Sequence, residues 1–155
     1  MKRFTLSLAL LLSMTLADAQ KVFQGMSSYS GDIVCNARDG KLYKGNSSYS
    51  ADVIVRLDGS KLYRSNSSHS ADVLLNYRNG KIYRGLSSYS ADVVATWRNG
   101  KMYRGSSSYQ ADILFNYRSN KVFRANSSYQ GDVLLNTSAP LHPMLLYWIL
   151  YGSAQ

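Results

Sequence analysis

Apolar and polar residues alternate along short segments of this chain, as they do in half-buried β-strands. In residues 91–98, every second residue from Ala91 to Trp97 is apolar, and the residues between them are mostly polar. The same period of two recurs in residues 71–78 and 111–118, so we predict strands with one face turned to the core. The side chains predicted to face inward are Val73, Leu75, Val93, Ile113, Phe115 and Leu135.

The alternating segment belongs to a unit of twenty residues that is repeated six times between Lys21 and Pro140 without insertion or deletion. In each copy the first Lys is followed by an aliphatic residue or Met, then by Tyr or Phe, a Ser-Ser pair and an Asp. A repeat this regular indicates one supersecondary unit copied around or along an axis. The copies begin at Lys21, Lys41, Lys61, Lys81, Lys101 and Lys121.

Dipeptides that favour tight turns follow three of the predicted strands. Asn79-Gly80, Asn99-Gly100 and Asp39-Gly40 accept the positive φ angles of a type I′ turn, which is the strongest local signal for a β-hairpin. The second and fifth copies have Gly59-Ser60 and Ser119-Asn120 instead. We expect a shifted or looser turn at those two positions.

The turn also sets the pairing of the strands. Counting back from Asn79-Gly80 places Tyr77 opposite Ile82 on the core face and Asn76 opposite Tyr83 on the outer face. The Ser-Ser segment supplies the second chain reversal of each copy. Every copy therefore contributes one short and one long strand, and six copies give twelve antiparallel strands.

Two arrangements of these strands are compatible with the repeat, a closed ring of hairpins and a β-solenoid. In a solenoid the six repeated Asp would stack about 4.8 Å apart, and like charges at that spacing destabilise a sheet. In a hairpin meander they lie two strands apart. We therefore predict an all-β fold, a closed ring or shallow barrel of six 20-residue hairpins formed by residues 20–140, with the solenoid as the alternative.

The apolar segment in residues 141–155 completes this prediction. Leu141 to Tyr151 is apolar on nearly every side, and Pro143 suits a first helical turn. A barrel of twelve strands is wider than the roughly eight-stranded barrel that side chains alone fill. We predict that the segment is a helix packed in the ring as a central plug, because it is too short to cross a bilayer.

The first nineteen residues differ in character from the repeats. Lys2 and Arg3 precede the apolar run Leu6 to Leu16, and Ala17 and Ala19 flank Asp18 in the small-x-small form of a cleavage site. This is typical of a secretory signal peptide and predicts a secreted or periplasmic protein, cleaved after Ala19. Cleavage removes two cations and one Asp, and lowers the net charge from +9 to +8.

The repeats resemble a known family. Tandem hairpins of the form GK-(I/L/M)-Y-R-G-x-SSYS-A-D that end in an apolar helix are similar to bacterial β-flower proteins. Those are in turn similar to the tubby C-terminal domain, a barrel threaded by a hydrophobic helix. The resemblance covers essentially the whole mature chain. It implies this architecture and, from the lipid binding of tubby-like domains, an anionic lipid partner, but it carries over no individual residue.

Catalytic constellations are missing from the sequence. His69 and His142 are its two histidines, and Cys35 is its single cysteine, so we expect neither an enzyme nor a cofactor or metal site. Cys35 takes a position that is apolar in the other copies, which favours a buried role over a reactive one. The repeated Asp could bind Ca²⁺, but hydrogen bonding to the Ser-Ser reversal is favoured.

Cations are the more informative residues. Across the turns, an Arg faces a Lys in four of the copies, and this would give one rim a positive potential. A solvated rim is the alternative. Tyrosines on the outer face, such as Tyr63, Tyr83 and Tyr103, could stack on sugar rings or pack across strands. The candidate anion-binding residues are Arg38, Lys41, Arg78, Lys81, Arg98, Lys101, Arg118 and Lys121.

Three hypotheses follow for function. The first is a non-enzymatic module that binds an anionic membrane surface or a polyanion such as a charged polysaccharide, with no sequence-specific binding of nucleic acid. The second is a structural or protein-interaction repeat protein without a small ligand. The third, a membrane-active protein, requires the C-terminal segment to leave the ring.

Overall fold

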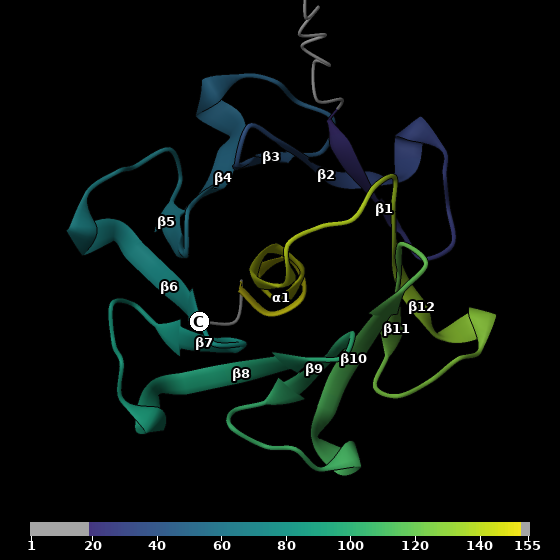
Figure 1. Cartoon of the computed structure of the whole chain (residues 1–155). Helices are drawn as coiled ribbons and strands as arrows, with labels where there is room; N and C mark the ends of the chain where they lie inside the picture. Colours follow the sequence, from purple (N-terminus) through teal and green to yellow (C-terminus); the bar gives the residue numbers. More distant parts are fainter. Residues whose placement is uncertain (1–18, 153–155) are drawn as a thin grey trace, which may run out of the picture.

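The computed structural model describes residues 19–152, which form a closed barrel of twelve antiparallel strands around one helix (Figure 1). Neighbouring strands follow chain order, and β1 pairs with β12 to close the ring. The predicted ring of hairpins is therefore confirmed, and the solenoid alternative is wrong. The strands are β1 (Gln20–Gln24), β2 (Ile33–Arg38), β3 (Lys41–Lys44), β4 (Val53–Asp58), β5 (Lys61–Arg64), β6 (Val73–Arg78), β7 (Lys81–Arg84), β8 (Val93–Arg98), β9 (Lys101–Arg104), β10 (Ile113–Arg118), β11 (Lys121–Arg124) and β12 (Val133–Thr137).

The tight turns set the register as the sequence predicts. Tyr77 lies opposite Ile82, and Asn76 lies opposite Tyr83. The expected shift is wrong for both atypical copies, since their strands keep the common register. Ser119 and Asn120 have φ angles of 49° and 59°, close to those of the Asn-Gly turns, and Arg118 still lies opposite Lys121. The second copy keeps the same register, with Asp58 opposite Lys61. The second copy reaches this register with a different turn, because Gly59 has a φ of 57° and Ser60 does not have a positive φ, as in a Gly-first type II′ turn.

A β-bulge in every copy changes which side chains reach the core. In the fourth copy Ile82 pairs with Ala95 and Tyr83 pairs with Val93, so Val94 is the extra residue. Directly opposed side chains share a face, which places Val93 on the outer face with Tyr83. Val73, Val93 and Ile113 are buried, but on the outer face, and their predicted inward orientation is wrong. Leu75, Phe115 and Leu135 belong to the central core as predicted.

The helix α1 (Pro143–Tyr151) runs through the middle of the barrel (Figure 1). His142 caps it, because its side chain accepts a hydrogen bond from the Met144 N–H. Its first turns bury Met144, Leu145, Leu146 and Tyr147 in one cluster with the inward residues of all six copies. This confirms the plug. None of the helices in residues 19–152 is long and apolar enough to cross a membrane.

A tip loop links the short and long strands of each copy and projects from the ring (Figure 1). In the fourth copy it comprises residues 85–92. Each tip loop ends in a 3₁₀ turn, and these are Ser30–Asp32, Ser50–Asp52, Ser70–Asp72, Ser90–Asp92, Gln110–Asp112 and Gln130–Asp132. The predicted signal peptide, apart from Ala19, lies outside the described residues.

Neighbouring copies are joined through these tip loops. Asn76 on β6 donates its side-chain amide to the carbonyls of Gly85 and Ser87, at 2.8 and 3.0 Å. Asn136 makes the corresponding bond to Ser27 at 3.0 Å and so closes the ring. A polar residue at this outer position thus anchors the tip loop of the next copy. These bonds hold the tip loops against the outer ends of the strands.

Candidate anion-binding surface on the outer face

The eight candidate cations form four directly opposed pairs. Arg38 lies opposite Lys41, Arg78 opposite Lys81, Arg98 opposite Lys101 and Arg118 opposite Lys121. The preceding residue of each long strand, such as Ala37 or Tyr77, packs on the central core, so the arginines lie on the outer face. We call these eight residues the cation band.

Each arginine of the band lies over an aromatic ring of the neighbouring short strand. The guanidinium carbon of Arg78 is 5.2 Å from the centre of the Tyr83 ring, and that of Arg98 is 4.9 Å from the Tyr103 ring. Arg38 over Tyr43 and Arg118 over Phe123 repeat the arrangement at 5.4 and 4.7 Å. These cation–π contacts hold the charge in place on the surface.

The outer-face tyrosines are accordingly packing partners of the strands. Tyr103 is 8% exposed, and Arg98 lies over its ring. Tyr63 lies under Arg56 at 5.6 Å. Of the two roles weighed for these tyrosines, the structure favours packing across strands over stacking on a ligand.

The band is interrupted in the second copy. There Asp58 takes the position of the arginine, lies opposite Lys61 and forms an ion pair with Arg56. That is the single ion pair in the described part of the chain, so none of the eight cations of the band has an acidic partner there. Their charge is left for solvent or for a ligand.

Five of the six tip loops carry an exposed tyrosine, which the alternating pattern of the strands does not predict. Tyr89, at the tip of the fourth copy, is 75% exposed, and the equivalent tyrosines are 75–78% exposed. The sequence does contain a signal for these tyrosines, because an aromatic residue recurs in a predicted turn, which contributes no side chain to the core. The exposed tip tyrosines are Tyr29, Tyr49, Tyr89, Tyr109 and Tyr129, and His69 takes the place of the sixth.

A small hydrogen-bonded clasp fixes each tip. The Ser87 hydroxyl accepts a bond from the Tyr89 N–H at 3.1 Å and donates one to the Asp92 carboxylate. The Asp92 N–H donates to the Tyr89 carbonyl at 3.0 Å. The same serine–carboxylate bond recurs in all six copies at 2.5–2.6 Å. The hydrogen-bonded role favoured for the repeated Asp is confirmed.

The band and the tips meet at the tip loops. Arg78 reaches the carbonyl of Ser87 at 3.5 Å, and Arg118 reaches that of Ser128 at 3.4 Å. Tyr89 lies two residues after Ser87, and Tyr129 directly follows Ser128. In these two copies a guanidinium group therefore contacts the tip loop within two residues of an exposed tyrosine.

A second set of cations lies at the other end of the short strands. Lys44 is opposite Cys35, Arg64 opposite Val55 and Arg84 opposite Leu75, so these side chains start from the core face. All are exposed. This set was not predicted from the sequence, although a cation ends the short strand in five of the six copies. We call it the mouth cations, and its members are Lys44, Arg64, Arg84, Arg104 and Arg124.

The remaining reactive side chains are isolated. Burial raises the pKa of Cys35 to about 12, which keeps its thiol protonated. Burial lowers the pKa of His142, whose ring caps the helix and meets Tyr77 edge-on at 5.1 Å. Within residues 19–152, no three side chains of His, Cys, Asp or Glu converge on a metal position.

Comparison with known proteins yields one family. A family model described as a 6-fold beta flower protein matches residues 22–147. No curated protein and no solved structure matches the chain.

Proposed function

The chain belongs to the 6-fold beta flower family, and on that scaffold we propose that it is a non-enzymatic, secreted or periplasmic module that binds an anionic surface, either lipid headgroups or a charged polysaccharide. The observation that carries the proposal is the cation band, eight cations gathered in four opposed pairs without an acidic partner in the described part of the chain. The family is not a known enzyme family.

The energetics of the band favour a ligand. Opposed like charges on neighbouring strands destabilise a sheet, so each Arg–Lys pair costs folding stability. An anion placed between them relieves that cost and gains charge-assisted hydrogen bonds. The arginines are already held over aromatic rings, so little side-chain freedom is lost on binding.

The repeat suits an extended partner better than a small one. Four equivalent pairs around one barrel can contact a surface or polymer at several points at once, and such linked contacts raise the overall affinity without new chemistry. The fixed, exposed tyrosines beside the band are amphipathic and are suited to a membrane interface or to sugar rings.

The test is binding to anionic and neutral vesicles, and to dextran sulfate, at increasing salt. Affinity for the anionic targets should fall steeply from low to physiological salt, because exposed charges are screened there over about 8 Å. A variant with Lys41, Lys81, Lys101 and Lys121 changed to Gln should bind about two to three decades more weakly, since each cation near an anionic membrane contributes about 1 kcal/mol.

A charge-matched control separates the band from net charge. Changing Arg64, Arg84, Arg104 and Arg124 to Gln removes the same charge from the mouth cations and should leave most of the binding. Equal loss in both variants, or no binding by the parent protein at low salt, would overturn the proposal.

A second candidate function is a protein-contact surface formed by the tips. Tyr, Ser, Gly and Asn dominate these loops, and the same composition serves recognition in antibody loops. Binding through the tips would depend weakly on salt. It would be lost on changing Tyr49, Tyr89 and Tyr109 to Ser, with the band intact.

A further inference from the structure

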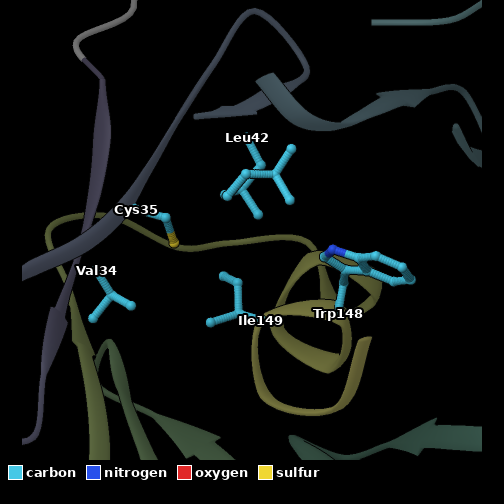
Figure 2. A pocket seen from close by; sticks show the side chains of 6 residues that line it. Val34, Cys35, Leu42, Trp148 and Ile149 are labelled. Carbon is cyan, nitrogen blue, oxygen red and sulfur yellow. The ribbon is translucent and has the colours of Figure 1, made fainter. Parts of the chain in front are cut away.

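An apolar cavity of about 280 Å³ lies between the first two copies and the last turns of α1. Every side chain that lines it is apolar or a thiol. Figure 2 shows Val34 and Cys35 on one side and Trp148 and Ile149 of the helix on the other, with the Cys35 sulfur pointing into the space between them. The lining residues are Val34, Cys35, Leu42, Ile54, Trp148 and Ile149.

The cavity follows from the asymmetry of one helix in a ring of six. Tyr151 stacks on Phe115 at 6.3 Å and donates to the Leu114 carbonyl at 3.4 Å, so the end of the helix is held against the fifth copy. The second copy lies across the ring from the fifth (Figure 1). The wall left behind carries Cys35 and Val55, which are smaller than the Leu75, Phe115 and Leu135 of the third, fifth and sixth copies. The fourth copy has the still smaller Ala95, but its Trp97 also packs against the core.

The bulge residues at this wall leave apolar surface open to solvent. Val34 is 44% exposed and Ile54 is 40% exposed, whereas their counterparts in the other copies, such as Leu74 and Leu114, are partly buried against the core. Together with the cavity, these two side chains form contiguous exposed apolar surface, which is typical of ligand-binding grooves.

Two cations are paired across the strands with residues at or next to the cavity lining. Lys44 lies directly opposite Cys35, and Arg64 lies directly opposite Val55, the neighbour of Ile54. Both start from the core face and are exposed. The mouth cations reach the end of the helix elsewhere too. Burial raises the pKa of Tyr151, and the charge of Arg104 partly offsets that rise.

We propose that this cavity binds a single-chain amphiphile with an anionic head, of the fatty carboxylate class. The acyl chain would lie between Val34, Ile54 and the Trp148 side of α1, and the carboxylate would lie at Lys44 and Arg64. At about 280 Å³ the cavity lies just below the range of about 300 to 1,000 Å³ that is usual for ligand sites, and it suits one alkyl chain better than a fused ring system. This site is separate from the cation band.

The direct test is titration of the purified protein with three probes that share one alkyl chain: dodecanoate, dodecanol and dodecyltrimethylammonium. Trp97 is changed to Phe so that fluorescence reports on Trp148, the other tryptophan of the chain. Dodecanoate should bind most tightly and the ammonium probe most weakly. Shortening the carboxylate by two carbons should weaken binding about tenfold. Equal affinity for all three probes, or no response from Trp148, overturns the proposal.

Two variants test where the alkyl chain and the carboxylate of the ligand bind. Cys35→Phe introduces the residue that the fifth copy carries at this position, and should abolish binding of dodecanoate and dodecanol alike. Lys44→Gln with Arg64→Gln should lower the affinity for dodecanoate at least tenfold and leave the affinity for dodecanol unchanged. The matched control, Arg84→Gln with Arg124→Gln, removes the same charge away from the cavity and should alter neither probe.

A variant at the exposed rim guards against misfolding of Cys35→Phe. Val34 is half-exposed, so Val34→Asp is compatible with folding. Its carboxylate should repel dodecanoate and spare the ammonium probe, inverting their order. A folded Val34→Asp protein that binds the probes in the same order of affinity as the parent protein would show that their alkyl chains do not enter this cavity.

Discussion

The rings of Phe115 and Tyr151 stack with their planes 11° apart, and this contact joins the fifth copy to the last turn of the central helix. Phe115 is fully buried. We expect Phe115→Ala to lower the free energy of unfolding by about 3–5 kcal/mol, because it leaves a cavity in the core and releases the helix end. Urea denaturation followed by far-UV circular dichroism measures this.

Tyr151→Phe serves as the partner of that experiment. It keeps the stacking and removes the hydrogen bond to Leu114, so we expect a loss of about 0.5–1.5 kcal/mol. Losses of similar size in the two variants would contradict the view that stacking, more than the hydroxyl, holds the helix.

Removal of the helix is the strongest test of the plug. We expect a chain that ends at Pro140 to unfold or aggregate, because the inward faces of all six copies would line a wet cavity. Burial of Met144, Leu145 and Leu146 is worth about 1.5–3 kcal/mol each, which together rivals the 5–15 kcal/mol of a typical domain. Thermal melting and gel filtration measure the outcome. An unchanged melting temperature would rule out the plug.

The hairpins could be predicted from the sequence because their signals are local. The turn dipeptides alone fix Tyr77 opposite Ile82, and the repeat then carries that register around the ring. The bulge could not be read in the same way. Val93 and Val94 are both apolar, so the alternation continues through the extra residue without a break, and Val93 is placed on the wrong face.

The site was predictable in position but not in detail. Pairing across a turn puts Arg78 beside Lys81, and the sequence shows it. The contact of Arg78 with Tyr83 depends on the conformation of the two side chains, and the periodicity of the sequence does not determine that conformation. The cavity beside α1 depends on where one helix rests within a six-fold ring, and that follows from Phe115 and Tyr151, which are far apart in the sequence.

The clasp at each tip predicts different costs for two adjacent serines. Ser87→Ala removes the bond to the Asp92 carboxylate and the acceptor for the Tyr89 N–H, so we expect a loss of about 1–3 kcal/mol. Ser88 is exposed, and Ser88→Ala should change stability by less than about 0.5 kcal/mol. Urea denaturation of the two variants provides the comparison. Equal effects would show that the clasp does not stabilise the tip.

Stability should fall in mild acid through His142. Burial lowers the pKa of His142 in the folded protein below its ordinary value of 6.5, so below that pH the unfolded chain binds more protons. Its contribution to stability is complete above that pH and is lost as the pH falls through the folded pKa. We expect the urea midpoint of the parent protein to decrease from about pH 7.5 to about pH 5.

Matched histidine variants isolate this effect. His142→Asn keeps a helix cap that does not titrate and should flatten the decrease. His69 is exposed at a tip, and His69→Asn should leave it unchanged. The assignment fails if the two variants show the same dependence on pH. Tyr77 contacts the His142 ring, and Arg38 and Asp39 line a second pocket together with His142. Both variants keep these three neighbours, so they do not contribute to the difference.

The turn of the fifth copy offers a stabilising change. Ser119 and Asn120 hold φ angles of 49° and 59°, where the equivalent turn of the fourth copy has Asn99 and Gly100. A left-handed conformation costs a residue with a Cβ about 1–2 kcal/mol, less for Asn than for most, and costs glycine nothing. We therefore expect Asn120→Gly to raise the free energy of unfolding by about 0.5–1 kcal/mol. The Asn120 carbonyl keeps its bond from the Thr137 N–H, because the backbone path is unchanged.

The reverse change in the fourth copy, Gly100→Asn, should destabilise the protein, since a Cβ there would lie 3.1 Å from the Tyr117 carbonyl oxygen. Urea denaturation of both variants measures the pair, and a loss of stability in Asn120→Gly would show that this turn is not limited by its left-handed backbone.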